Sequence, residues 1–293
     1  MAKKLEAKPI IEEKLQVLKQ QVGVQTKLGK TPYLRVFQVG NNHASELYIA
    51  HKKKICELIG AQFELVNLTE NISAQTLKDM LTESNHDNKV TGCFVQFPIP
   101  SHISNLEVQQ WIAPQKDLDC LNFQNLKNIY YNELPLALDI SSLLLPCTPK
   151  GILSLFKYYQ INLTGKKIVV IGRSYIVSKP LVLLLNNLNA TVFWCHSKTQ
   201  NLREITQLSD IIISAVGQPN FIDESFFHLT NSQMIIDVGM NKLNNKTCGD
   251  CQLDNLPSNI AAYTPVPGGI GPLTVISLME NLIILNKMQM KNS

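Results

Sequence analysis

Apolar residues in the first half of the chain alternate between helical and strand-like spacing. Over residues 9–28 they recur every three or four positions, as at Leu15, Leu18 and Val22, which is typical of one face of a helix. The next apolar run stops at Gly40 and predicts a strand. Because further helices and strands alternate after it, the pattern indicates a parallel sheet covered by helices. We predict helices over residues 9–28, 44–59 and 74–82, and strands over 33–39, 63–66 and 90–96.

A second series of strands and helices follows residues 119–145, whose apolar positions have no regular period. Pro146 and Pro149 mark the break, and a proline- and glycine-rich segment, 263–272, leads into a strongly apolar final helix. We therefore predict an α/β fold of two βα domains, the second a Rossmann-like doubly wound parallel sheet, with a cleft between them. The predicted elements are helices 152–159, 176–188, 201–208 and 273–285, and strands 168–171, 191–194, 210–215 and 234–238. One domain is expected over residues 1–145 and the other over 146–271, with the helix of 272–293 packing back onto the first.

The composition is that of a globular protein with a large core, because 45% of its 293 residues are apolar. The net charge of +4 is spread thinly, and the only cationic block is 52–54, so we expect neither nucleic-acid nor membrane binding. No apolar run is long enough to span a bilayer, and the amino terminus has no signal-peptide pattern. We therefore expect a cytoplasmic protein.

The number and spacing of the cysteines also favour the cytoplasm. The seven cysteines form no dense framework, and their odd number indicates free thiols in a reducing environment. Cys248 and Cys251 make a single C-x-x-C motif without a second pair or clustered histidines, so we expect no metal site.

Residues 167–180 predict a phosphate-binding turn. The four β-branched residues of 168–171 indicate a strand buried on both faces, and Gly172 allows the backbone to approach a pyrophosphate at the start of the next helix. The usual dinucleotide fingerprint has three glycines, whereas this turn has only Gly172, with Arg173, Ser174 and Ser178 nearby. A plain strand-turn-helix packing unit is the alternative.

The end of the second strand of this domain indicates which dinucleotide is bound. NAD enzymes carry an acidic residue there for the ribose 2′-hydroxyl, but residues 194–199 contain none and offer Ser197 and Lys198 instead. Arg173 can reach across from the turn, and it is one of only three arginines in the chain. These residues favour a 2′-phosphate and hence NADP, unless Ser197 and Lys198 are ordinary turn residues. Glycines also follow the third and fourth strands, at 217 and 239, where backbone passes close to a flat cofactor.

Candidate acid/base residues lie in the first domain. Tyr48 and Lys52 are four residues apart on a predicted helix and share one face. A buried lysine there has a lowered pKa and can carry protons near neutral pH, although a surface lysine is the simpler alternative. Gln96 ends a predicted strand, where ligands meet parallel sheets, and its amide can accept a hydrogen bond from Lys52 or only satisfy a turn. Asp119 follows Asp117 by two residues and suits a pair of N–H donors, or else caps a turn.

Together these motifs resemble one family over nearly the whole chain: the bifunctional methylenetetrahydrofolate dehydrogenase/cyclohydrolase. The first-domain blocks include Gly92-Cys-Phe-Val-Gln-Phe-Pro-Ile-Pro100 and Lys116-Asp-Leu-Asp119. The second-domain blocks include Pro146-Cys-Thr-Pro-Lys-Gly151 and Thr264-Pro-Val-Pro-Gly-Gly-Ile-Gly-Pro272. Further matching blocks are 39–52, 171–177, 195–197 and 236–239.

The resemblance implies a cytoplasmic homodimer of one-carbon metabolism and purine biosynthesis, with folate in the cleft beside the nicotinamide. It implies NADP-dependent oxidation of 5,10-methylene-tetrahydrofolate to the methenyl compound, and hydrolysis of that compound to 10-formyl-tetrahydrofolate. By resemblance, Lys52 is the acid/base, Gln96 positions it, Tyr48 orients the pterin, and Asp119 pairs with the pterin N–H groups. Pro267 and Gly271 line the folate site. The implied NADP-binding residues are Thr148, Gly172, Arg173, Ser174, Ser197, Met240 and Thr274.

Departures from the family leave other interpretations open. Family members usually carry glycine in place of Cys120 and Ser178, leucine in place of Phe97, and asparagine or lysine in place of Tyr175; residues 122–145 also diverge. A dehydrogenase without cyclohydrolase activity is one alternative, and a folate- or nucleotide-binding protein with degraded catalysis is another. A shikimate-type NADP enzyme explains residues 146–240 but leaves Tyr48 and Gln96 without a role.

Overall fold

The computed structural model describes residues 2–131, 139–228, 230–244, 246–254 and 256–291. Part of the divergent 122–145 segment and the end of the expected 272–293 helix therefore lie outside the described residues. The chain forms two compact units, each built from three segments. We call them the six-stranded unit (Met1–Ile11, Ile129–Ile140 and Thr148–Thr274) and the three-stranded unit (Glu12–Asn128, Ser141–Cys147 and Val275–Ser293).

The three-stranded unit contains a parallel sheet in the order β3 (Gln62–Leu68), β2 (Tyr33–Val39), β4 (Gly92–Gln96). Helices α3 (Ala74–His86) and α4 (Asn105–Trp111) cover one face, where Leu77, Leu81 and Val108 pack with Cys93 and Val95. Successive strand side chains point to opposite faces, so Phe94 and Gln96 face α2 (His43–Leu58) instead. This alternation brings Gln96 to the helix that carries Lys52.

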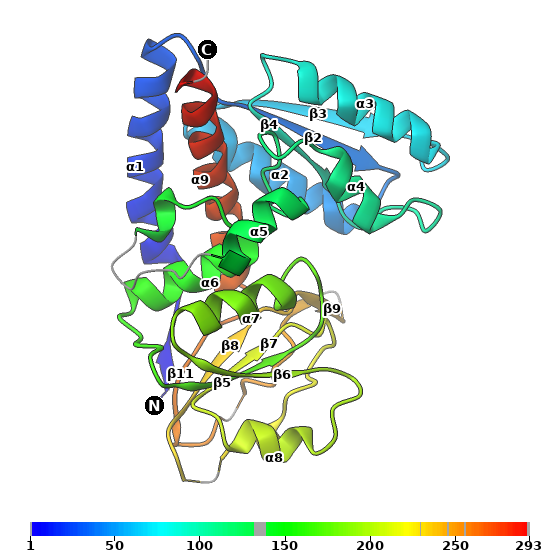
Figure 1. Cartoon of the computed structure of the whole chain (residues 1–293). Helices are drawn as coiled ribbons and strands as arrows, with labels where there is room; N and C mark the ends of the chain where they lie inside the picture. The colour runs from blue at the N-terminus through cyan, green and yellow to red at the C-terminus, as the bar shows by residue number, and fades with distance from the viewer. Residues whose placement is uncertain (1, 132–138, 229, 245, 255, 292–293) are drawn as a thin grey trace. The chain divides into compact units, whose positions relative to one another are not determined.

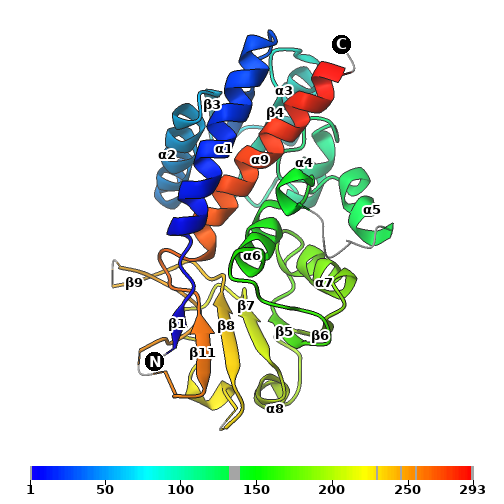
Figure 2. The ribbon, with the colours of Figure 1, turned by 90° about the vertical axis from the view of Figure 1, so that its left-hand side faces the viewer.

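Two long helices complete this unit, α1 (Lys8–Lys27) and α9 (Ile270–Lys291), which lie side by side in Figures 1 and 2. Gln25 Nε2 donates to the Ile283 carbonyl at 3.0 Å and Asn286 Nδ2 donates to Gln25 Oε1 at 2.9 Å. Asn281 in α9 donates to the carbonyls of Leu118 and Leu145, both at 2.8 Å. These bonds attach α9 to the loop that carries Asp119.

The six-stranded unit contains the predicted doubly wound parallel sheet. Its strand order is β1 (Lys3–Lys4), β11 (Ile260–Tyr263), β8 (Gln233–Asp237), β7 (Ile211–Ser214), β5 (Lys167–Ile171), β6 (Thr191–Cys195). Every neighbouring pair is parallel. Helices α7 (Ser178–Asn187) and α8 (Leu202–Gln207) lie on opposite faces in Figure 1. The remaining elements of this unit are α6 (Cys147–Tyr158), the hairpin β9 (Asn241–Leu243) and β10 (Lys246–Cys248), and the short helix η2 (Glu224–Phe226). The short helix η1 (Ile140–Ser142) lies where the chain passes from this unit to the three-stranded unit.

The structure adds elements that the apolar pattern did not predict. Helix α5 (Phe123–Tyr131) lies in the stretch interpreted as lacking a regular period, and its nine residues bury only part of their apolar side chains. Strands β1, β9, β10 and β11 have two to four residues each, which is too short for a period to appear. The final helix is longer than predicted at both ends: it begins at Ile270, within the proline- and glycine-rich segment, and continues to Lys291.

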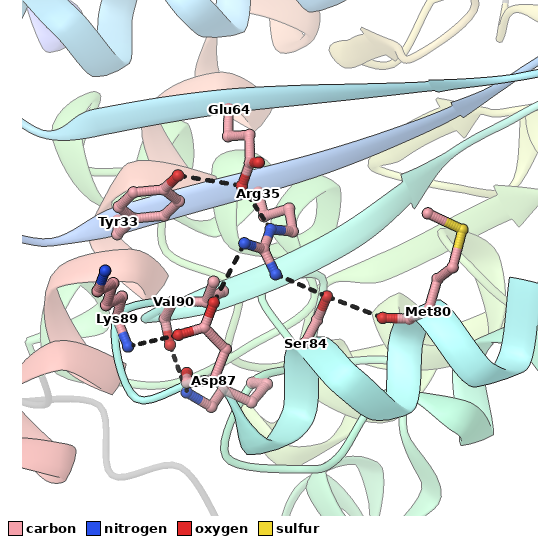
Figure 3. A network of polar contacts seen from close by, with 9 residues as sticks. Tyr33, Arg35, Glu64, Met80, Ser84, Asp87, Lys89 and Val90 are labelled. Atoms are coloured by element: carbon pink, nitrogen blue, oxygen red, sulfur yellow. Dashed lines mark hydrogen bonds and ion pairs between the residues drawn. The ribbon is translucent and has the colours of Figure 1, made fainter.

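Arg35 joins three elements of the three-stranded unit through a network of polar contacts (Figure 3). From β2 its guanidinium donates to Glu64 on β3, to Ser84 Oγ on α3 at 3.1 Å and to Asp87 Oδ2 at 3.1 Å. Tyr33 donates to the same Glu64 carboxylate at 3.0 Å. The guanidinium is largely buried, with 17% of the side chain exposed. The backbone N–H of Lys89 and the charge of Arg35 lower the pKa of Asp87.

We predict that Arg35→Met destabilises the protein, because it leaves two partly buried carboxylates without their cation. The expected loss is about 2 kcal/mol of unfolding free energy, allowing for solvent screening of Glu64 and Asp87. Urea denaturation measures it, with Arg203→Met as the matched control, because Arg203 is exposed on α8. Equal stability of the two variants would contradict the prediction.

Candidate active site

Lys52 is the centre of the candidate site in the three-stranded unit. It lies in α2 with 6% of its surface exposed, unlike Lys53 and Lys54, which are exposed. Its Nζ donates to Gln96 Oε1 at 2.9 Å and lies 4.0 Å from the centre of the Phe94 ring and 4.9 Å from that of Tyr48. The Gln96 amide N–H in turn donates to the Phe97 carbonyl at 2.8 Å, which fixes the side chain with its oxygen toward Lys52.

The electrostatics of Lys52 follow from this burial. Loss of hydration lowers the pKa of Lys52, and the negative charge of Asp119 opposes part of that effect. Burial raises the pKa of Asp119, while the charge of Lys52 and a hydrogen bond from the Cys147 thiol lower it. Lys52 and Asp119 therefore form one electrostatic pair. The two groups therefore titrate as a pair.

Asp117 and Asp119, expected to face the same way, have different environments. Asp117 is fully buried and accepts hydrogen bonds from the Asn122 backbone N–H at 2.7 Å and from Asn125 Nδ2 at 3.0 Å. Its burial raises its pKa to about 7. Asp119 is partly exposed. Asp117 thus has the turn-fixing role that was the alternative for this segment, whereas Asp119 interacts with Lys52 and Cys147.

Cys120 has a backbone conformation that explains why the family carries glycine here. Its φ is +55°, in the left-handed region, where a non-glycine residue costs about 1 kcal/mol. The Cys120 side chain is buried and its thiol lies 3.5 Å from the Leu144 carbonyl oxygen. The substitution therefore keeps the turn that carries Asp119.

In the six-stranded unit, the predicted phosphate turn connects β5 to α7. Gly172 has φ +137°, and a Cβ there would lie 2.6 Å from the Ala215 carbonyl oxygen and 2.7 Å from Ser178 Oγ. No other residue fits this position without displacing its neighbours. Ser174 Oγ accepts from the Ile176 backbone N–H at 3.1 Å and so shapes the turn before the helix begins.

Ser178, which replaces a family glycine, is the first residue of α7 and is fully buried. Its hydroxyl has no hydrogen-bond partner among the described residues and lies against Gly172. The helix and strand thus pack around the extra side chain, which leaves one buried hydroxyl unsatisfied. A site with this defect costs about 1 kcal/mol or more.

Arg173 and Ser197 come together across the ends of β5 and β6, where Arg173 Nη2 donates to Ser197 Oγ at 3.3 Å. Both side chains are exposed, as is Lys198. A guanidinium, a hydroxyl and a lysine at this point, with no carboxylate in residues 194–199, match a phosphate group. Together with the close approach at Gly172, these residues fit the phosphates of NADP.

The other predicted cofactor and folate residues of this unit form two further groups. Thr274 Oγ1 donates to Thr148 Oγ1 at 3.2 Å. The exposed side chain of Met240 approaches Gly271 so closely that a Cβ at Gly271 would lie 2.9 Å from Met240 Cε. Pro267 is exposed in the segment before α9.

Two residues near Lys52 were not among the predicted site residues. Phe94 lies two residues before Gln96, so the strand period places both on the α2 face, and this signal was present in the sequence. Cys147, beside Asp119, precedes Thr148 in the matching 146–151 block. Its contact depends on how the 141–147 segment folds back, which no local pattern predicts.

No helix among the described residues has the length and apolar content needed to span a membrane.

Comparisons with known proteins cover both parts of the chain. Residues 5–119 match the catalytic domain of tetrahydrofolate dehydrogenase/cyclohydrolase, and residues 146–290 match its NAD(P)-binding domain. The bifunctional protein FolD of Mycoplasma capricolum is 37% identical over 98% of this chain and 99% of its own length.

Two crystal structures show the same architecture. The FolD methylenetetrahydrofolate dehydrogenase/cyclohydrolase of Campylobacter jejuni superposes with a TM-score of 0.90 at 34% identity, covering 98% of this chain and 99% of that one. The Trypanosoma brucei enzyme, solved with NADP cofactor and an inhibitor, has a TM-score of 0.89 at 28% identity, covering 98% of each chain. The expected fold class and family resemblance are confirmed: the chain belongs to the tetrahydrofolate dehydrogenase/cyclohydrolase family.

Proposed function

We propose that this protein is a bifunctional enzyme of one-carbon metabolism. It oxidises 5,10-methylene-tetrahydrofolate with NADP to 5,10-methenyl-tetrahydrofolate and hydrolyses the product to 10-formyl-tetrahydrofolate. Family membership over both units supports the pair of activities. The observation that carries the proposal is the hydrogen bond from the buried Lys52 amine to Gln96, which gives the second step an acid/base. The same family match sets aside the shikimate-type interpretation.

In the oxidation step the chain's residues hold and orient the reactants. Bound NADP would supply the acceptor for a hydride from the methylene carbon of the substrate. Its phosphates are proposed to be bound by Gly172, Ser174 and the Arg173–Ser197 pair. Thr148, Met240 and Thr274 are proposed to hold the rest of the cofactor, and Pro267 and Gly271 to contact the folate.

In the hydrolysis step Lys52 is proposed to move the protons. Its lowered pKa increases the neutral amine available near neutral pH, which can accept a proton from the water attacking the methenyl carbon. When the bond from that carbon to one ring nitrogen breaks, the nitrogen needs a proton, which the Lys52 ammonium returns. Water supplies two protons in all, so one is released. Gln96 keeps the amine in place, Tyr48 orients the pterin, and the Asp119 carboxylate pairs with pterin N–H donors.

The two alternatives with reduced activity are less well supported. A dehydrogenase without cyclohydrolase activity has no need of the buried amine and its amide partner, yet both are present. A catalytically degraded binding protein was suggested by Cys120 and Ser178. The turn at Cys120 and the approach at Gly172 persist with these residues in place.

We also propose a cytoplasmic homodimer. All seven cysteines are free thiols and six of them are buried, as a reducing compartment allows. Strand β3 is an edge of its sheet within the described part of the chain, and it carries the exposed Leu65. An unpaired edge of seven residues is a surface that proteins commonly cover.

We predict that Lys52→Met abolishes most methenyl-tetrahydrofolate hydrolysis, followed as loss of methenyl absorbance. Removing a general acid/base lowers the rate by about 100-fold or more. Lys53→Met is the matched control, because Lys53 lies next in the same helix but is exposed beside Glu57. If hydrolysis by the Lys52 variant stays near the unsubstituted rate, Lys52 is not the acid/base.

We predict that Arg173→Ala weakens the preference for NADP over NAD, because it removes a cation expected to meet the 2′-phosphate. The KM for NADP in the appearance of NADPH rises about tenfold, since a charged hydrogen bond contributes about 1.5 kcal/mol at an exposed site. The KM for NAD changes little, and Arg203→Ala leaves both unchanged. Equal rates with either cofactor in the unsubstituted protein would overturn the assignment.

We predict that sedimentation equilibrium gives twice the chain mass of 32.9 kDa at micromolar concentration. Association would also be weakened by Leu65→Lys, which places a charge on the β3 edge. A purely monomeric protein would contradict the homodimer proposal and leave the catalytic assignment intact.

A further inference from the structure

The Cys248–Cys251 motif, which has no role in the function above, carries a buried carboxylate. Asp250 is fully buried, and among the described residues five donors meet its two oxygens. Oδ2 accepts from Val216 N at 2.8 Å, Ser214 Oγ at 3.1 Å and Gly217 N at 3.3 Å, and Oδ1 accepts from Asn241 Nδ2 at 2.9 Å and Gln218 N at 3.0 Å. One side chain thus fixes both the loop after β7 and the residue that begins β9.

Asp250 is itself held by the end of a central strand. Asp237, the last residue of β8, accepts from the backbone N–H groups of Asp250 at 3.0 Å and Cys251 at 2.8 Å. A Cβ at Gly249 would lie 1.9 Å from Asp237 Oδ2, so only glycine lets the chain approach this closely. The position of the Asp250 carboxylate is therefore set by the sheet.

The two loops that Asp250 fixes lie at the carboxyl ends of β7 and β8, where parallel sheets of this type meet their ligands. A Cβ at Gly239 would lie 2.2 Å from Asp250 Oδ1, so the carboxylate also occupies the space beside this glycine. The exposed Met240 follows directly. Arg173 and Ser197 follow β5 and β6, which lie two and three places from β8 in the strand order, with β7 between β8 and β5.

We propose that Asp250 is a positioning residue for the nicotinamide half of NADP, which it serves by fixing the backbone of residues 216–218 and 239–241. The proposal rests on the NADP assignment made above. The proposal divides the NADP site into two parts. The Arg173–Ser197 pair recognises the 2′-phosphate end of NADP, and the loops fixed by Asp250 bind the nicotinamide end.

Asp250→Asn tests this with little change of volume. The new amide replaces one acceptor oxygen with an N–H₂ donor. The N–H and O–H groups that donated to that oxygen lose their acceptor, and the backbone that they hold shifts. Binding is measured by isothermal titration calorimetry with two ligands, NADP and 2′,5′-ADP, which has the adenosine and 2′-phosphate but no nicotinamide. We expect the Kd of NADP to rise about tenfold, as for the loss of one or two such hydrogen bonds, and that of 2′,5′-ADP to stay within about twofold.

Arg173→Ala is the matched control, because it is expected to weaken the binding of both ligands.

Should Asp250→Asn fail to fold, Asn241→Ala decides the question. This variant removes one donor to Asp250 Oδ1 from a partly exposed position, and it is expected to raise the Kd of NADP about threefold and leave that of 2′,5′-ADP unchanged. Asp250 is not a positioning residue if the folded variant binds NADP with the Kd of the unsubstituted protein, or if the Kd values of both ligands rise by the same factor. If the unsubstituted protein binds neither ligand, the NADP assignment fails instead.

Discussion

The hydrogen bond between the Lys52 amine and the Gln96 amide oxygen is the interaction on which the proposed chemistry depends. An ammonium group loses most of its hydration when it is buried, and this cost must be offset by a fixed acceptor and a nearby negative charge. Gln96 is the acceptor, Asp119 supplies the charge, and the Phe94 and Tyr48 rings lie close to the amine. Burial lowers the pKa of Lys52, and the charge of Asp119 opposes part of that effect.

Much of the fold of the three-stranded unit serves this arrangement. The strand period of β4 sends Cys93 and Val95 into the core beneath α3 and α4, and leaves Phe94 and Gln96 for α2. Asp117 fixes the turn that contains Asp119 through Asn122 and Asn125, which follow it. In the six-stranded unit the constraint is close backbone approach, met by glycine at 172, 239 and 249. The buried carboxylates of Asp237 and Asp250 use that closeness to fix the loops that follow β7 and β8.

The sequence predicted the parts of the molecule that follow from periodicity. Strand β2 was predicted at its observed bounds, and the pairing of Lys52 with Gln96 followed from a helix face and a strand end. The residue pattern alone, without the family resemblance, left the roles of Asp117 and Asp119 open, because two acids one residue apart look alike until burial separates them. Helix α5 was missed because its short amphipathic pattern resembles an irregular loop. Most contacts of Asp250 escaped prediction because four of the five join residues 32 to 36 positions apart, and three of those four use backbone N–H groups, which carry no sequence signal.

The most direct test of the account is the pKa of Lys52 itself, measured by NMR titration of protein labelled with carbon-13 at the lysine ε position. The spectrum of the Lys52→Met variant identifies the resonance. The account predicts a midpoint below the ordinary lysine value of 10.5, because burial disfavours the ammonium form more than Asp119 restores it. A midpoint at or above 10.5 would show that Lys52 stays protonated at neutral pH, and it would contradict its proposed role as the proton carrier.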